Sequence, residues 1–134
     1  MAEDTYESGG GQAFITTAGV VISKENMPKI MKAGMLRDKK NKFAEFFFVL
    51  RGDTRELLGY KSKQEDPANP KDAAKIKFSL AECHGIRPVA DKKYPFAFEV
   101  ELGKKVYIFA CDMPDERESW MHHLRRFAVL HGKD

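Results

Sequence analysis

The hairpin expected between residues 96 and 111 constrains the fold more than any other part of the sequence. In Phe96–Leu102, apolar and polar side chains alternate, which is typical of a strand with one buried face. A two-residue turn that begins with glycine follows, and Lys105–Cys111 then forms a second apolar strand. The residues expected to face the core are Phe96, Phe98, Val100 and Leu102, and those expected to face outward are Ala97, Glu99 and Glu101.

The spacing of apolar residues changes from two to about 3.6 directly after this hairpin. Asp112 is expected to cap a helix that has Pro114 in its first turn. The apolar face of that helix is expected to contain Trp120, Leu124, Phe127 and His131. Because such a face must be buried, we expect the helix to pack on the strands that precede it.

Further short strands, separated by turn signals, occupy the middle of the chain. They are expected around residues 32–36 and at residues 43–50, 56–61, 75–80 and 85–89. Residues 64–71 contain two prolines and several Asp and Asn residues, so they are expected to form a loop. Several antiparallel strands followed by one helix predict an α+β domain, either a barrel or a sandwich, with the helix as a lid.

The N-terminal part of the chain has a different composition. Residues 1–12 are acidic and glycine-rich, which predicts a disordered tail. Residues 13–28 form an apolar extension that provides a possible extra strand. The extension is expected either to cover a sheet edge of its own domain or to dock on a partner, and the sequence does not separate these alternatives.

The composition favours a cytoplasmic protein. The chain has 134 residues with 43% hydrophobic and 32% charged residues, which suits one globular domain. No apolar run is long enough to cross a membrane, and the acidic start is unlike a signal peptide. Cys83 and Cys111 are expected as two thiols, with one disulfide as the alternative.

Three local patterns occur in an order that resembles a pleckstrin-homology (PH) domain over residues 29–131. They are KAGML at residues 32–36, FFFVLR at residues 46–51, and ERESWM at residues 116–121. The layout of Leu58-Gly59-Tyr60 and of residues 79–83 is most similar to PH domains of insulin-receptor-substrate and Dok-type adaptors. The resemblance implies a bent, seven-stranded antiparallel barrel that the C-terminal helix closes at one end, with Trp120 as its structural hallmark.

The resemblance also implies where a phosphoinositide would bind. Family members that bind these lipids tightly carry a Lys on the first strand and two basic residues on the second. Lys32 matches the first of these positions, but Ala44 and Phe46 occupy the other two. This departure argues against tight headgroup recognition.

A local excess of positive charge remains beside this motif. The net charge of the chain is only +3, yet residues 27–42 contain six basic residues and one acidic residue. Each basic residue near an anionic lipid surface contributes about 1 kcal/mol, so this stretch predicts weak, salt-sensitive membrane binding. The candidate lipid-binding residues are Lys32, Arg37, Lys39, Lys40, Lys42 and Lys61.

The sequence therefore predicts a non-enzymatic PH-type binding module of a cytosolic adaptor or signalling protein. Its expected partners are anionic membrane lipids, phosphoinositides among them, and it would associate peripherally with the plasma membrane. The alternative is a PH-fold scaffold that binds a protein and has no lipid recognition. No nucleophile–base set, phosphate loop or metal-ligand spacing occurs, so no catalytic residue, cofactor or metal is expected. Nucleic acid is not expected as a partner, because burial explains the Phe-rich run.

Overall fold

The computed structural model describes residues 13–15, 21–23 and 29–127. Its first elements are β1 (Ala13–Ile15), β2 (Val21–Ser23), β3 (Ile30–Asp38), the short 3₁₀ helix η2 (Lys39–Asn41) and β4 (Ala44–Arg51). They are followed by β5 (Glu56–Tyr60), β6 (Ile76–Ser79), β7 (Cys83–Val89), β8 (Phe96–Leu102), β9 (Lys105–Cys111) and the helix α1 (Pro114–Arg125). The tail predicted for residues 1–12, and the end of the domain beyond residue 127 with His131, lie outside the described residues.

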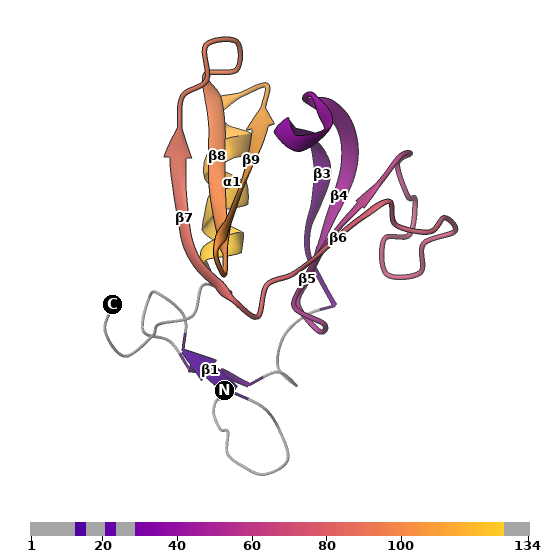
Figure 1. Cartoon of the computed structure of the whole chain (residues 1–134). Helices are drawn as coiled ribbons and strands as arrows, with labels where there is room; N and C mark the ends of the chain where they lie inside the picture. Colours follow the sequence, from indigo (N-terminus) through magenta and orange to yellow (C-terminus); the bar gives the residue numbers. More distant parts are fainter. Residues whose placement is uncertain (1–12, 16–20, 24–28, 128–134) are drawn as a thin grey trace.

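Seven strands form one antiparallel sheet in the order β6-β5-β4-β3-β9-β8-β7, while β1 and β2 pair separately with each other. The β3–β9 pairing that joins the two halves is short, because only Arg37 with Ala110 and Asp38 with Phe109 are in register. Figure 1 accordingly shows β3 to β6 on one side of the molecule and β7 to β9, with α1, on the other. This seven-stranded antiparallel sheet with one C-terminal helix confirms the fold predicted from the sequence.

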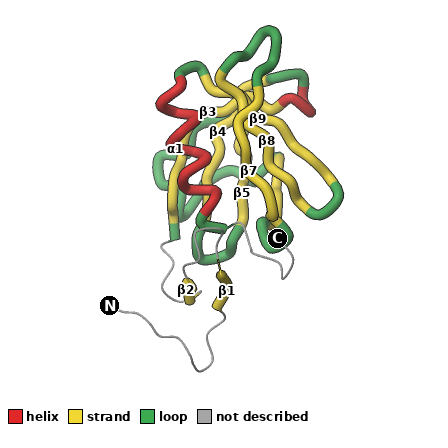
Figure 2. Tube along the Cα trace, turned by 90° about the vertical axis from the view of Figure 1, so that its left-hand side faces the viewer, coloured by secondary structure: helices red, strands yellow, loops and turns green. Residues whose placement is uncertain are grey.

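The helix α1 packs along the sheet and closes the core (Figure 2). Trp120 is fully buried, together with the rings of Phe48, Phe98 and Phe109. Gly34 on β3 lies against the indole, where an added Cβ would be 3.8 Å from Cζ2 of Trp120. The hallmark tryptophan therefore fills the space between α1 and the first strand of the barrel.

Two local expectations were wrong. The helix cap is Met113 and not Asp112, because Pro114 occupies the first helical position. The carboxylate of Asp112 instead lies 3.5 Å from the guanidinium of Arg37.

Ala97 was expected to face solvent but is fully buried. Ala97 is paired with Ala110 of β9, and Ala110 is paired in turn with Arg37 of β3. The guanidinium of Arg37 lies against the ring of Tyr94, which belongs to the β7–β8 connection.

The β4–β5 contact leads to a stability prediction for Gly59. An added Cβ at this position would lie 2.9 Å from Cε1 of Phe48 and 3.0 Å from Cβ of Ile76, which is too close. Phe48 is fully buried and cannot move aside, so Gly59→Ala should lower the free energy of unfolding by about 1–3 kcal/mol. Urea denaturation would measure this change. Gly34→Ala is the matched control, because its Cβ has room, and a loss at Gly34 as large as at Gly59 would contradict the packing argument.

The two cysteines are free and buried, as expected for thiols. Burial raises the pKa of Cys83 to about 11 and that of Cys111 to about 12. Thiolate is the reactive form, so we expect neither cysteine to react with Ellman's reagent at pH 8 until urea unfolds the chain. Above the ordinary thiol pKa only the unfolded chain ionises, so these groups lower the stability of the fold as the pH rises past about 9. Rapid labelling of the native protein would contradict the burial of both groups.

Candidate functional site

The β3–β4 connection forms a compact loop that presents three lysines. Asp38 at the end of β3 is buried, and its carboxylate accepts hydrogen bonds from the Lys40 amide at 3.1 Å and from Nδ2 of Asn41 at 2.6 Å. Lys42 and Phe43 then adopt left-handed backbone angles, with φ of 59° and 60°. The carboxylate and the backbone fix this shape, and the exposed residues of the loop are Asn41 and the three lysines Lys39, Lys40 and Lys42.

The β7–β8 connection supports this loop from the outside. The rings of Phe43 and Tyr94 lie 4.3 Å apart, and Nζ of Lys39 is 3.8 Å from the carboxylate of Asp91. The guanidinium carbon of Arg37 is 5.7 Å from the centre of the Tyr94 ring. The lysines of the loop are thus held on a structured turn, which reduces the entropy lost when they bind an anion.

Three of the six candidate lipid-binding residues, Lys32, Arg37 and Lys61, lie outside the β3–β4 loop. Lys61 is exposed and directly follows β5, whose last residue, Tyr60, is paired with Phe47 near the base of the loop. Arg37 is partly buried and paired with Asp112. Lys32 lies elsewhere: its Nζ is 3.6 Å from Glu116 and 5.3 Å from the centre of the Trp120 ring. The structure therefore does not bring Lys32 to the loop, and its ammonium group is engaged with α1.

A groove of about 540 Å³ lies between η2 and β9. Its lining consists of Lys39, Lys40, Lys105, Val106, Tyr107 and Ile108. Nζ of Lys40 is 5.7 Å from the centre of the Tyr107 ring, which places the cation over the aromatic wall. Lys105 and Tyr107 were not among the residues predicted from the sequence, because only the register between β3 and β9 brings them next to the lysines of η2.

The second strand supplies no cation to this site. Ala44 and Glu45 are exposed at the start of β4, and Phe46 is partly buried with its ring 6.3 Å from that of Phe48. Phe46 thus belongs to the edge of the core. A side chain with this packing does not coordinate a phosphate group.

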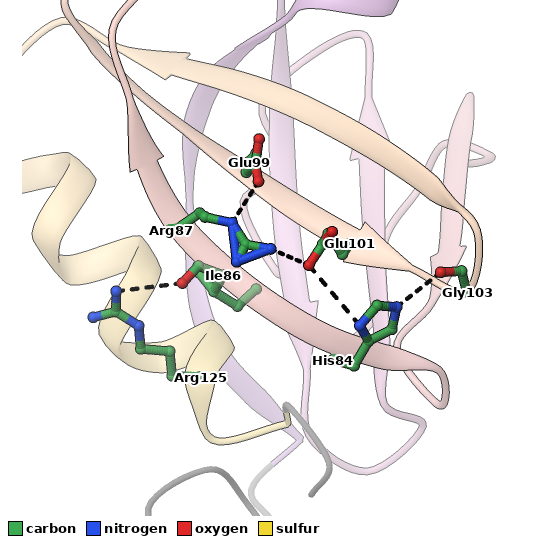
Figure 3. Close-up of polar contacts among 7 residues, drawn as sticks. All are labelled: His84, Ile86, Arg87, Glu99, Glu101, Gly103 and Arg125. Atoms are coloured by element: carbon green, nitrogen blue, oxygen red, sulfur yellow. Dashed lines mark hydrogen bonds and ion pairs between the residues drawn. The ribbon is translucent and has the colours of Figure 1, made fainter. Parts of the chain in front are cut away.

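The acidic residues of β8 are already paired (Figure 3). Arg87 donates to Glu99 at 2.6 Å and also to Glu101, whose carboxylate faces the ring of His84. Nε2 of His84 lies 2.8 Å from the carbonyl oxygen of Gly103. These contacts tie β7 to β8 and to the β8–β9 turn, so Glu99 and Glu101 serve as ion-pair partners and do not form an acid–base pair.

Within the described residues, no group of three or more His, Cys, Asp or Glu side chains could hold a metal ion. No helix in the same part of the chain is both long and apolar enough to cross a bilayer.

Comparison with known proteins identifies the family. A model of the PH-domain family matches residues 28–128. The chain belongs to this family. The PH domain is a non-catalytic module fold, and the observed sheet and helix agree with solved PH domains. No curated protein matches this chain.

Solved PH domains are similar in fold at low sequence identity. The C-terminal PH domain of pleckstrin is 23% identical, with a TM-score of 0.58 over 74% of this chain and 96% of that chain. The same domain in complex with D-myo-Ins(1,2,3,5,6)P5 is 22% identical, with a TM-score of 0.59 over 75% and 97%. The Slm1 PH domain in complex with D-myo-inositol-4-phosphate is 18% identical, with a TM-score of 0.60 over 76% and 98%. At these identities the likeness concerns the fold alone.

Proposed function

We propose that this PH domain recruits its protein to anionic membranes through the loop between β3 and β4. The observation that carries the proposal is the fixed, exposed position of Lys39, Lys40 and Lys42 on a loop pinned by Asp38. Lys105 adds a fourth cation across the groove. Each contributes about 1 kcal/mol near an anionic surface, or roughly 4 kcal/mol together.

This binding is expected to be electrostatic and weakly selective. The two positions on β4 that would grip a headgroup are Ala44 and Phe46, so no basic pair fixes the ring of an inositol phosphate. Pleckstrin and Slm1 PH domains have been solved with inositol phosphates, which supports a polyanionic ligand for this fold. We extend the proposal to an adaptor module because the sequence of residues 58–60 and 79–83 resembles PH domains of insulin-receptor-substrate and Dok-type adaptors. Peripheral association with the cytoplasmic side of the plasma membrane would follow.

Sedimentation with vesicles of three compositions tests the proposal. The vesicles contain phosphatidylcholine alone, phosphatidylcholine with phosphatidylserine, or the latter with a phosphoinositide at matched total charge. We expect no binding to the first and similar binding to the second and third, because surface charge decides the affinity. Strong selectivity for the phosphoinositide would contradict the diffuse mode. Absence of binding to all three would reject membrane recruitment and favour a scaffold that binds proteins.

A further inference from the structure

The strand β9 has an open edge beside the groove. Within the described residues, β3 pairs with β9 only at Arg37 and Asp38, which face Ala110 and Phe109. The chain then enters η2 and leaves the sheet, while β9 extends four residues further back, to Lys105. These four residues, 105–108, line the groove of about 540 Å³. The described part of the sheet therefore leaves half of β9 without a strand neighbour on that side.

The hairpin register shows which backbone groups face this opening. The β8–β9 turn has two residues, and Gly103 has φ of +61°, so Leu102 and Lys105 form the closing pair of the hairpin. Hydrogen-bonded and non-hydrogen-bonded positions alternate along an antiparallel pair. The N–H and C=O groups of Lys105 and Tyr107 thus point to β8, and those of Val106 and Ile108 point to the groove. Ala110, next in this series, faces β3, which agrees with its pairing to Arg37.

The charged side chains that line the groove are all lysines, and one of them, Lys39, also lies 3.8 Å from the carboxylate of Asp91. Lys39 and Lys40 form one wall of the groove, and Lys105 lies on the opposite wall. The neighbouring acids of β8, Glu99 and Glu101, are paired with Arg87. Val106 is 49% exposed, which is unusual for a large apolar side chain of this domain and leaves contact area for a ligand.

We propose that the groove binds an extended acidic peptide segment of a partner protein. The peptide adds to β9 as an antiparallel strand, the more stable of the two pairings, with its main chain bonded to Val106 and Ile108. Its carboxylates lie against Lys39, Lys40 and Lys105. An open strand edge supplies both donors and acceptors, a combination that an extended peptide satisfies. This activity goes beyond membrane recruitment, and it shares Lys39 and Lys40 with it, so peptide and anionic vesicles compete.

A peptide with controlled backbone chemistry tests strand addition on the unaltered protein. The probe is a fluorescein-labelled, end-blocked octapeptide of alternating Glu and Thr, and its binding is followed by fluorescence anisotropy. Two further versions carry N-methyl groups on the four Glu or on the four Thr residues, which removes the main-chain donors from one edge of the strand at unchanged charge. Only one edge can face β9, so the affinities of the two methylated peptides should differ about tenfold or more. Equal affinities would show attraction by charge alone and overturn the proposal.

Two measurements on the protein side complete the test. Amide hydrogen exchange at Val106 and Ile108 should slow when the peptide is added, and unchanged exchange at both would overturn the proposal. Val106→Pro removes an N–H that β8 does not use, so it should weaken peptide binding about tenfold. Val106→Thr also changes the side chain but keeps the N–H, so it separates the two effects and should bind the peptide more tightly than Val106→Pro. Peptide binding that persists when phosphatidylserine vesicles fail to bind would support the peptide site and reject membrane recruitment.

Discussion

Replacing Trp120 with alanine should lower the free energy of unfolding by about 3–5 kcal/mol. The indole is fully buried and belongs to the main core cluster with Phe48, Phe98 and Phe109. It also lies against Gly34, so its removal opens a space between α1 and β3 that a backbone glycine cannot fill. Urea denaturation followed by circular dichroism would measure the change, because tryptophan fluorescence is lost with the side chain.

Two variants make the Trp120 result interpretable. Trp120→Phe keeps an aromatic ring in the cavity and should lose less stability than Trp120→Ala. Val106→Thr changes an exposed side chain and should stay within about 0.5 kcal/mol of the native chain. A loss below about 1 kcal/mol for Trp120→Ala would show that the indole does not close the barrel, contrary to the packing described above.

Neutralising Lys39, Lys40 and Lys42 to glutamine should weaken binding to phosphatidylserine vesicles about a hundredfold at low salt. Each cation contributes about 1 kcal/mol, and the loss of about 3 kcal/mol corresponds to that factor. All three side chains are exposed, so the fold should be retained. The vesicle partition coefficient, measured by co-sedimentation over a range of lipid concentrations, gives the effect.

A matched triple variant separates the position of the charges from their number. Lys29, Lys75 and Lys77 are also exposed, and they precede β3 or lie at the β6 edge, away from η2. Their replacement by glutamine changes the net charge by the same amount and should weaken vesicle binding much less. Equal losses in the two triple variants would mean that net charge alone drives binding, with no special role for the β3–β4 loop.

The parts of the fold that local sequence determines could be predicted. The limits of β8 and β9 agree with the expected strands, because strict alternation and a two-residue turn fix both register and ends. Trp120 was placed in the core because the helical spacing of apolar residues allows only one buried face. Asp112 was misassigned by one position, since a carboxylate before Pro114 fits a helix cap as well as an ion pair with Arg37.

The candidate site depends on contacts between distant parts of the chain, which the sequence does not display. Lys105 joins Lys40 only because β3 and β9 meet near their ends. Lys32 precedes the basic loop by a few residues, yet it lies over Trp120 and beside Glu116. The charge of residues 27–42 could thus be read from the sequence, but its division between α1 and the open loop required the tertiary structure.

The salt dependence of vesicle binding tests the central claim most directly. The native chain and the Lys39, Lys40 and Lys42 triple variant are sedimented with phosphatidylserine vesicles between about 0.01 and 0.15 M salt, where the screening length falls from about 30 Å to about 8 Å. The account predicts that the native chain binds at low salt and loses most of its affinity at physiological salt, whereas the variant binds weakly throughout. Saturable binding of both proteins that does not change with salt would contradict recruitment through the β3–β4 loop.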